Sequence, residues 1–369
     1  MRILDRYVAW NFIVGFIITT LVLIGLCTLV DLFVNLDEFA ERSDLGAAAV
    51  AGNIYSYYSA RSTLWFRDLA GVITVIAAVF SLARMTYSNE LVAVMASGVS
   101  LKRVIAPIIL LSLGSMGLIV IDQEFLIPRL TTQLIRSHDD LAGQKVHNVW
   151  FMNDDRGSLI CTQQFETNAM LSPVIILRKP VPQTTEYEVV DVIKADRAVH
   201  DPARGGWRLE NGRYLAVVDD PTRPADMTSR AVDFYATDLT PAQIPLKQQE
   251  GYKSLLSYAQ LLALEKQEHR IRDKAELYLH KHARITDPLI NIVMLVLALP
   301  VLVVRDPKTL KTAIMKCFGL VALCYSVAFL SKMFATEAFL GQVRPELWTW
   351  APIILFVPLA FIELDSMKT

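Results

Sequence analysis

The chain has 369 residues, 53% of them hydrophobic, with a formal net charge of −1 and a mean hydropathy of +0.37. An ordinary soluble domain is about 45–50% apolar, so this composition indicates an integral membrane protein. The net charge lacks the basic excess that a nucleic-acid-binding face needs, and we therefore expect no nucleic-acid partner.

Three apolar runs come before a polar middle region. The first, residues 12–30, holds 19 uncharged residues, enough to cross a hydrocarbon core about 30 Å thick. The N-terminus runs straight into it without an A-x-A-like cleavage site, so we interpret it as an uncleaved span. The second, residues 69–82, is short, so its helix is expected to begin earlier and to carry Arg67 and Asp68 into or near the membrane. The third is residues 104–121.

The polar segment between the second and third runs, residues 83–103, has the pattern of a short helix lying on the membrane face. Leu91, Val94 and Met95 recur at helical spacing, and the sequence Ala-Ser-Gly at 96–98 ends the pattern. Glu90 is its one carboxylate among three basic residues. The segment is either a loop helix with solvated charges or a docking element for a partner.

The polar region at about 125–276 is predicted to be a separate all-β domain. A hairpin is predicted around residues 154–157, a short strand is expected to end at Pro180, and residues 186–220 are expected to supply three more strands. Short strands at spacings of about 8 to 12 residues are typical of a sandwich or jelly roll. The absence of helical crossovers between the strands argues against a doubly wound α/β fold.

The last third of the chain returns to helical periodicity. Residues 255–286 are predicted to form a charged helix that continues without a break, as a stalk, into a fourth span ending near residue 304. Residues 317–331 and 347–362 are predicted to be the fifth and sixth spans. The fold class is thus an α-helical membrane protein with six transmembrane helices and an inserted all-β domain. The predicted divisions are 1–124, 125–276 and 277–369.

Basic residues in the short loops predict the orientation, because such loops stay on the cytoplasmic side. The N-terminus, the segment 83–103 and the link 305–316 are all basic, and the predicted span count places them on one side. Both termini are therefore expected in the cytoplasm, and the β domain is expected on the opposite side.

The sequence offers no catalytic or metal motif. It lacks G-x-x-x-x-G-K-[ST], so no nucleotide is expected in a P-loop, and it lacks H-E-x-x-H and G-x-S-x-G. His280 and His282 are two apart on a predicted helix and do not share a face. We expect no cofactor in this chain.

Five basic residues are candidates for binding an anionic ligand. Arg129, Arg136, Lys281 and Arg284 are expected at the outer ends of the third and fourth helices, where the positive-inside bias predicts few bases. Either they only fix the helix ends at the interface or they meet an anionic lipid head group. Arg67 also has two interpretations. Either it pairs with the neighbouring carboxylate of Asp68, or it is a charge that faces an internal cavity.

Four stretches of sequence resemble one family over nearly the whole chain. They are the opening ILDRYV, the sequence SNEL followed by MASGVS in the segment 83–103, the pattern GGWRLENGRYL, and ELYLHKHARITDPL followed by ALPVLVVRDP. The chain resembles the lipopolysaccharide-export permeases LptF/LptG. This resemblance implies a protein of the cell inner membrane that has six transmembrane helices and a β-jellyroll on the periplasmic side.

The resemblance also implies partners and site residues. A second homologous permease would form a heterodimer with this chain, and a cytoplasmic ABC ATPase dimer would bind ATP and Mg. A bitopic LptC-like jellyroll partner and a periplasmic bridge protein would receive lipopolysaccharide or a related anionic glycolipid. The chain would be a transporter subunit and not an enzyme.

By the same resemblance, residues 84–100 would form the helix that couples the permease to the ATPase. Glu90 matches the family's coupling glutamate, and Leu91, Met95, Ser97 and Gly98 belong to the same element. Arg129 and Arg136 lie roughly where basic residues line the family's cavity.

Two alternatives stay open on the residues alone. One is a permease of another ABC class, of the lipoprotein-release or efflux type, which usually has four spans. The other is a non-transporting membrane anchor that displays a β binding module. The function of such an anchor would survive deletion of the segment 83–103.

Overall fold

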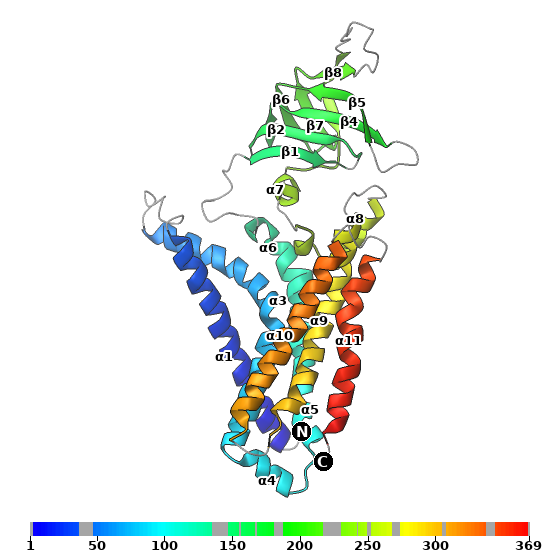
Figure 1. The fold of residues 1–369 in the computed structure, drawn as a ribbon. Coiled ribbons are helices and arrows are strands. Elements are labelled where there is room, and N and C mark those ends of the chain that lie inside the picture. The colour runs from blue at the N-terminus through cyan, green and yellow to red at the C-terminus, as the bar shows by residue number, and fades with distance from the viewer. Residues whose placement is uncertain are drawn as a thin grey trace.

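A computed structural model of the chain shows a helical bundle with a β domain above one of its ends (Figure 1). The structure describes residues 3–36, 47–134, 147–154, 156–166, 168–180, 187–216, 230–241, 243–248, 252–267, 274–304, 308–336 and 344–367. Both chain termini lie near the end of the bundle farther from the β domain, which we call the inner end (Figure 1).

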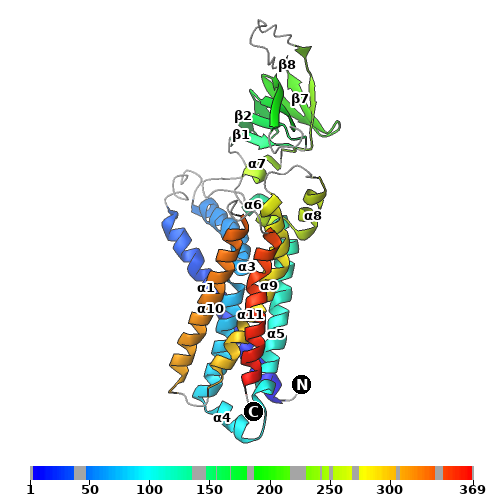
Figure 2. The ribbon, with the colours of Figure 1, turned by 45° about the vertical axis from the view of Figure 1, so that its right-hand side comes forward.

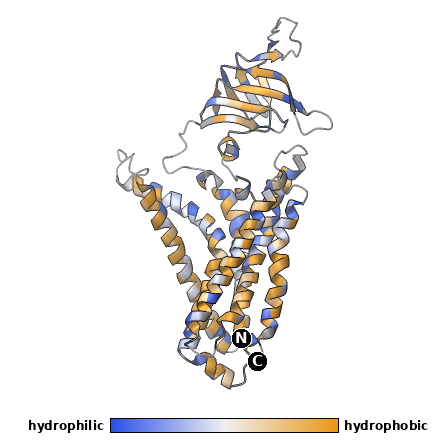
Figure 3. Ribbon diagram, in the orientation of Figure 1, coloured by the Kyte–Doolittle hydropathy of each residue, from blue (hydrophilic) through white to orange (hydrophobic). Residues whose placement is uncertain are grey.

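Within these ranges, 6 helices are long and apolar enough to cross a membrane. They are α1 (Ile3–Val34), α3 (Ala47–Tyr87), α5 (Leu101–Ile121), α9 (Lys274–Leu302), α10 (Leu310–Thr336) and α11 (Pro345–Ser366). Apolar residues dominate their middle portions, and hydrophilic residues gather toward both ends of the bundle (Figure 3). The predicted fold class, six spans with an inserted all-β domain, is confirmed. The count also disfavours a four-span permease.

The helices extend beyond the apolar runs that predicted them. Helix α3 is 41 residues long and begins well before its apolar run, as the shortness of that run predicted, and Arg67 and Asp68 lie at its middle. At the outer end, α5 continues through the π-helix η2 (Asp122–Leu126) into α6 (Ile127–Leu134). Helix α6 is amphipathic: Ile127 and Leu134 are buried, whereas Arg129 is exposed.

Helix α9 and the segment before it differ from the prediction. The prediction of a continuous stalk is wrong, because the chain folds into η3 (Tyr252–Leu255), α8 (Tyr258–Gln267) and then α9. Lys281 of α9 forms an ion pair with Glu265 of α8, with Nζ and Oε1 3.0 Å apart. One unbroken helix would separate these 16 residues by about 24 Å at 1.5 Å per residue. Helices α8 and α9 therefore pack against each other.

The bundle core lies where α3 and α9 meet the other spans. Gly71 of α3 allows the closest approach, since a Cβ built there would lie 2.3 Å from Asn291 Oδ1 and 2.8 Å from Met294 Cε, both on α9. Helix α1 packs on α3 and α5, and α11 packs on α9 and α10. Helices α3 and α9 are thus the central pair.

Within the described residues, ten strands, all paired antiparallel, form the β domain, in the order β10-β7-β6-β3-β2-β4-β5-β8-β9, with β1 also paired to β2. Their bounds are β1 His147–Asn153, β2 Leu159–Glu166, β3 Ala169–Leu171, β4 Val174–Pro180, β5 Tyr187–Lys194, β6 Arg197–Asp201, β7 Gly206–Glu210, β8 Arg213–Ala216, β9 Arg230–Ala231 and β10 Phe234–Ala236. The predicted hairpin at 154–157 and the strand ending at Pro180 are confirmed.

Strand β2 divides the sheet into two wings that share one core. One end of β2 pairs with β4 and the other end with β3, and the chain between β3 and β4 turns at Ser172, which has φ 49°. Ile175 and Ile193 of one wing lie in the same buried cluster as Trp207 of the other. The wings therefore fold over a common apolar interior, as in the predicted sandwich or jelly roll.

Residues 187–216 hold four strands, although three were predicted for 186–220. The missed break lies at Ala195 and Asp196, where no glycine, proline or asparagine marks a turn. A backbone hydrogen bond from Asp196 N to Glu210 O, 3.1 Å long, stabilises this turn. A contact 14 residues away in the sequence therefore decides where β5 ends.

A buried carboxylate lies at the edge of the apolar interior of the β domain. Asp154 accepts hydrogen bonds from the backbone N–H groups of Arg156 and Ser158, at 3.0 and 2.7 Å, and from the Tyr235 hydroxyl. Burial, followed by this bond to Asp154, raises the pKa of Tyr235 above its ordinary value. The phenol thus stays protonated where a free tyrosine would ionise.

Candidate functional site

A short helix, α4 (Glu90–Ala96), lies across the inner end between α3 and α5 (Figure 1). It begins after Asn89, whose φ of 57° turns the chain, and it ends at a turn in which Gly98 has φ 77°. The first residues of the predicted coupling segment 84–100 belong to α3, which extends to Tyr87. A sharp turn therefore separates α4 from each neighbouring span.

One side of α4 faces the bundle. Leu91 is fully buried in an apolar cluster at the inner end, which we call the inner cluster; it also contains Met85, Val104, Leu302 and Met367. Met95 is partly buried against the same cluster. Leu91 and Met95 therefore fix the position of α4 relative to the spans.

The other side of α4 is exposed. Tyr87 and Val92 are 61% and 39% exposed, Ser97 and Gly98 are also exposed, and Glu90 is half-buried. The Ser97 hydroxyl donates to Val94 O at 2.7 Å, within the helix itself. A partly apolar face with one carboxylate at its edge suits contact with another protein.

At the outer end, two of the predicted basic residues meet on one carbonyl oxygen. Arg284 donates from Nη2 to Ser254 O at 2.6 Å and also to Leu256 O, and Arg67 donates from Nη1 to Ser254 O at 3.3 Å. Arg67 also forms an ion pair with Asp68 at 2.8 Å. Arg284 is only 9% exposed. Both guanidinium groups therefore bond to groups of this chain.

The other predicted bases are placed differently. Lys281 pairs with Glu265 and lies 5.0 Å from the centre of the Tyr278 ring. Arg129 is exposed on α6 and has no ion pair within the ranges that the structure describes. Arg136 lies outside the described residues. Of the four described bases, Arg129 is thus the most accessible to a ligand.

Three further charged residues at the outer end were not predicted as site residues. Asp122 is 3% exposed, and its Oδ2 has no hydrogen-bond partner among the described residues. Lys253 is 4% exposed and pairs with Glu276 at 2.7 Å. The sequence could have identified Asp122 as a candidate, because this carboxylate directly follows an uncharged run of 18 residues, 104–121.

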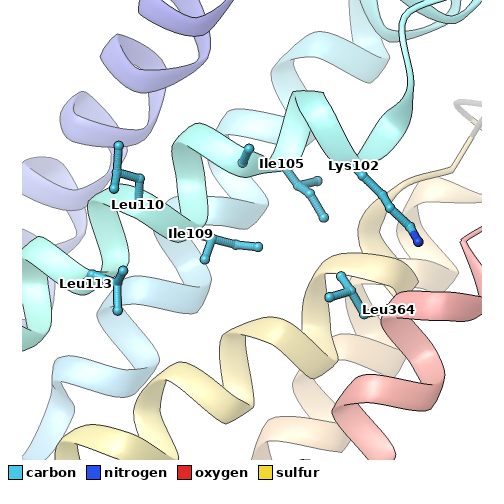
Figure 4. Close-up of a pocket in the computed structure, with 7 residues that line it drawn as sticks. Lys102, Ile105, Ile109, Leu110, Leu113 and Leu364 are labelled. Atoms are coloured by element: carbon cyan, nitrogen blue, oxygen red, sulfur yellow. The ribbon is translucent and has the colours of Figure 1, made fainter.

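A groove of about 290 Å³ runs between α5 and α11 near the inner end (Figure 4). Its lining is almost entirely apolar and consists of Lys102, Ile105, Ala106, Ile109, Leu110, Leu113 and Leu364. Lys102 Nζ lies 3.5 Å from Asp365 Oδ1 at the rim. Such a lining can hold an alkyl chain but offers little to a charged head group.

Several spans present uncovered apolar faces. Large apolar side chains of α1, α10 and α11 are exposed on the isolated chain, among them Leu21 and Phe33 of α1, Phe329 of α10, and Ile354 and Phe361 of α11. Water cannot cover such faces in a membrane span, so lipid or another membrane protein must. Among the described residues, no group of three or more His, Cys, Asp or Glu could hold a metal ion.

Comparison with known proteins gives one family. The family described as lipopolysaccharide export system permease LptF/LptG matches residues 6–364. No curated protein matches the chain.

Proposed function

Because this chain belongs to the lipopolysaccharide export system permease LptF/LptG family, we propose that it is one permease subunit of an ABC transporter that extracts lipopolysaccharide, or a related anionic glycolipid, from the inner membrane. Six apolar helices and the family make it a multi-pass protein of that membrane. The proposed direction is outward, from the spans to the β domain.

The observation that carries this proposal is the unequal packing of the spans. Of the residues in the most apolar part of α3, 61% are buried within the chain, whereas the share is 11% in α1 and 22% in both α10 and α11. Spans in a membrane associate by close packing of their side chains, so the poorly packed α1, α10 and α11 are the sides left for lipid chains and for a second permease. A heterodimer would enclose the lipid between such faces.

Motion would enter at the inner end. We assign the exposed side of α4 and Tyr87 to contact with the cytoplasmic ABC ATPase dimer, which binds ATP and Mg. Glu90 at the edge can pair with a basic residue of the ATPase. Leu91 transmits the movement by packing into the inner cluster. Both termini would then be cytoplasmic, in agreement with the basic inner loops.

The lipid phosphates would be held at the outer end. Arg129 is the first candidate because its guanidinium is exposed, and an arginine fork can bind phosphate through two parallel bonds. Arg136 follows it by seven residues and is proposed to act with it. Arg67, Lys281 and Arg284 already bond within the chain, so we assign them to holding this end in shape.

The β domain would pass the lipid onward. Among the described residues, β1 pairs with β2 alone, so we propose its other edge as the place that accepts a further strand. We propose that a bitopic, LptC-like jellyroll partner and a periplasmic bridge protein continue the sheet from this domain.

Photo-crosslinking tests the proposal most directly. A photoreactive residue at Phe125, which is 56% exposed in η2, should crosslink to lipopolysaccharide in cells. Arg129→Glu should reduce the yield about fivefold or more, since each base near a lipid surface contributes about 1 kcal/mol. Arg208→Glu, a reversal at an exposed arginine of the β domain, is the control. Equal yields in both variants would contradict the head-group assignment.

A further inference from the structure

One segment leads from the β domain back to the membrane, and we call it the return segment. It follows β10, and its described parts are residues 239–241, α7 (Gln243–Gln248) and residues 252–258, which include η3 and end at Tyr258, the first residue of α8. Helix α7 lies between the β domain and the outer end of the bundle (Figures 1 and 2). It packs against β1 on one side and against η3 on the other.

The upper part of the return segment belongs to the core of the β domain. Leu239 and Ile244 are fully buried in the same cluster as Val149 and Trp207. Trp207 Nε1 donates to Leu239 O at 2.9 Å. A buried indole that bonds a backbone carbonyl fixes the direction in which the chain leaves the sheet. Helix α7 must therefore move with the β domain.

The lower part belongs to the bundle. Leu255 of η3 is buried with Ala60 of α3 and Ile127 of α6, and Leu246 of α7 packs on the same cluster. Within six residues, α7 thus places Ile244 in one core and Leu246 against the other. No flexible spacer within α7 separates the two contacts.

Charged residues from three spans hold the lower part by its backbone. Arg67 of α3 and Arg284 of α9 donate to Ser254 O, at 3.3 and 2.6 Å. Glu124 of η2 accepts from Tyr258 N at 3.0 and 2.9 Å through its two oxygens. A backbone N–H or C=O group has no rotamers with which to follow a partner that moves. These bonds therefore depend on the positions of the three helices.

An ion pair provides a fourth attachment of the return segment to the bundle. Lys253, 4% exposed, extends to Glu276 in the first turn of α9, with Nζ and Oε2 2.7 Å apart. We call Arg67, Glu124, Lys253, Glu276 and Arg284 the outer clamp. Charge-assisted hydrogen bonds are short and strong but lose strength steeply with distance and angle.

We propose that the outer clamp is a mechanical relay, which makes the orientation of the β domain depend on the spacing of α3, η2 and α9 at their outer ends. When one helix shifts, its bond to the return segment breaks while the other bonds persist, so the segment tilts with the helices that retain it. Helix α7 carries that tilt into the β core through Ile244. This relay holds whatever the cargo is, so it stands apart from the lipid-binding assignment.

Distance measurements between spin labels test the relay. Labels at Arg208→Cys in β7 and at Leu347→Cys at the outer end of α11, both exposed positions, report the domain orientation in a full-length chain lacking its native cysteines. The parent should give one narrow distance peak in lipid nanodiscs. Arg67→Ala with Arg284→Ala should abolish that single peak and spread the distances.

Lys281→Gln with Glu265→Gln is the matched control, because it removes an ion pair at the same end of α9 that does not touch the return segment. The control should keep the narrow peak. A folded clamp variant with the parent's peak would overturn the relay.

Because Arg284 is buried, a second variant leaves both arginines intact. Glu124→Leu removes the acceptor of the Tyr258 N–H, and hydrogen exchange of that amide should quicken about tenfold, as expected for a lost bond to a charged group. Glu124→Gln keeps an acceptor oxygen and should restore slow exchange. The spin-label peak should broaden in Glu124→Leu. Faster exchange without broadening would overturn the relay, and so would unchanged exchange.

Discussion

The two ends of the helical bundle are held together by opposite kinds of contact. At the inner end, α4 is held by apolar side chains, with Leu91 buried among the inner cluster. At the outer end, the return segment makes apolar contacts through Leu246 and Leu255, and it is held in addition by the charges of the outer clamp on backbone groups and on one another. An apolar cluster has no preferred direction, whereas a charged hydrogen bond has a narrow range of distance and angle.

This difference indicates different mechanical roles. Leu91 is close-packed in the inner cluster, and close-packed side chains transmit displacement, so α4 and the spans at the inner end move as one body. The clamp either keeps a bond or loses it, so the outer end can switch between discrete arrangements. The function that we propose, with motion entering at the inner end and lipid leaving at the outer end, needs both properties. The predictions below test this contrast, from the largest expected effect to the smallest.

Leu91→Asp should disrupt the apolar packing at the inner end. The substitution places a carboxylate in a fully buried site among apolar side chains, where the charged form is strongly disfavoured. We expect loss of the folded protein, measured as loss of the monodisperse peak in size-exclusion chromatography of the detergent-solubilised chain. Val92→Asp, at an exposed position on the same helix, should keep that peak. Equal behaviour of the two variants would contradict the packing role of Leu91.

Glu276→Leu should weaken the outer end by about 3 kcal/mol, the low end of the range for leaving one partner of a buried pair uncompensated. The low end applies because the Glu276 side chain is 31% exposed, although Lys253 is almost fully buried. The effect should appear as a lower thermal unfolding midpoint.

The double variant Lys253→Met with Glu276→Leu should recover much of that loss, since no buried charge then remains unpaired. If the double variant were as unstable as the sum of the two single variants, the ion pair would not be the source of the effect.

The β domain extends the comparison to a polar bond inside an apolar core. The raised pKa of Tyr235 means that the folded state keeps its proton while the unfolded state loses it above pH 10. This contribution to stability is fully present below pH 10 and is lost as pH rises through the folded-state pKa. Thermal midpoints measured between pH 8 and 11 should fall less steeply for Tyr235→Phe than for the parent.

Tyr235→Phe should also lower stability at neutral pH by about 1 kcal/mol or somewhat more, because Asp154 loses a donor. Val189→Ala, at an exposed position of β5, is a control that should leave the pH profile unchanged. The same slope above pH 10 in Tyr235→Phe and in the parent would refute the role assigned to this phenol.

The ion pair at the inner end should matter least. Lys102 and Asp365 lie 3.5 Å apart, and their side chains are 50% and 91% exposed. Exposed pairs contribute about 0–1 kcal/mol, so Asp365→Asn should change the thermal midpoint by less than the error of the measurement. A loss as large as that of Glu276→Leu would mean that both ends depend on charge, and the contrast between them would be wrong.

The sequence by itself determined the membrane character, the six spans and the β domain. These features depend on local quantities, the length of apolar runs and the alternation of strands, which any stretch carries without reference to the rest of the chain. It also located α4, because Leu91 and Met95 follow helical spacing and Gly98 can adopt the positive φ that ends the turn. It selected basic residues at the outer end by their unexpected side of the membrane.

Only the tertiary structure decided what those residues contact. Arg67 and Arg284 are 217 positions apart in the sequence, yet both donate to the carbonyl of Ser254. The break between α8 and α9 is decided in the same way, since the helical pattern continues across it while Lys281 reaches back to Glu265. A hydrogen bond requires two groups within about 3 Å, and that distance is a property of the packed helices, which no periodicity of the sequence records.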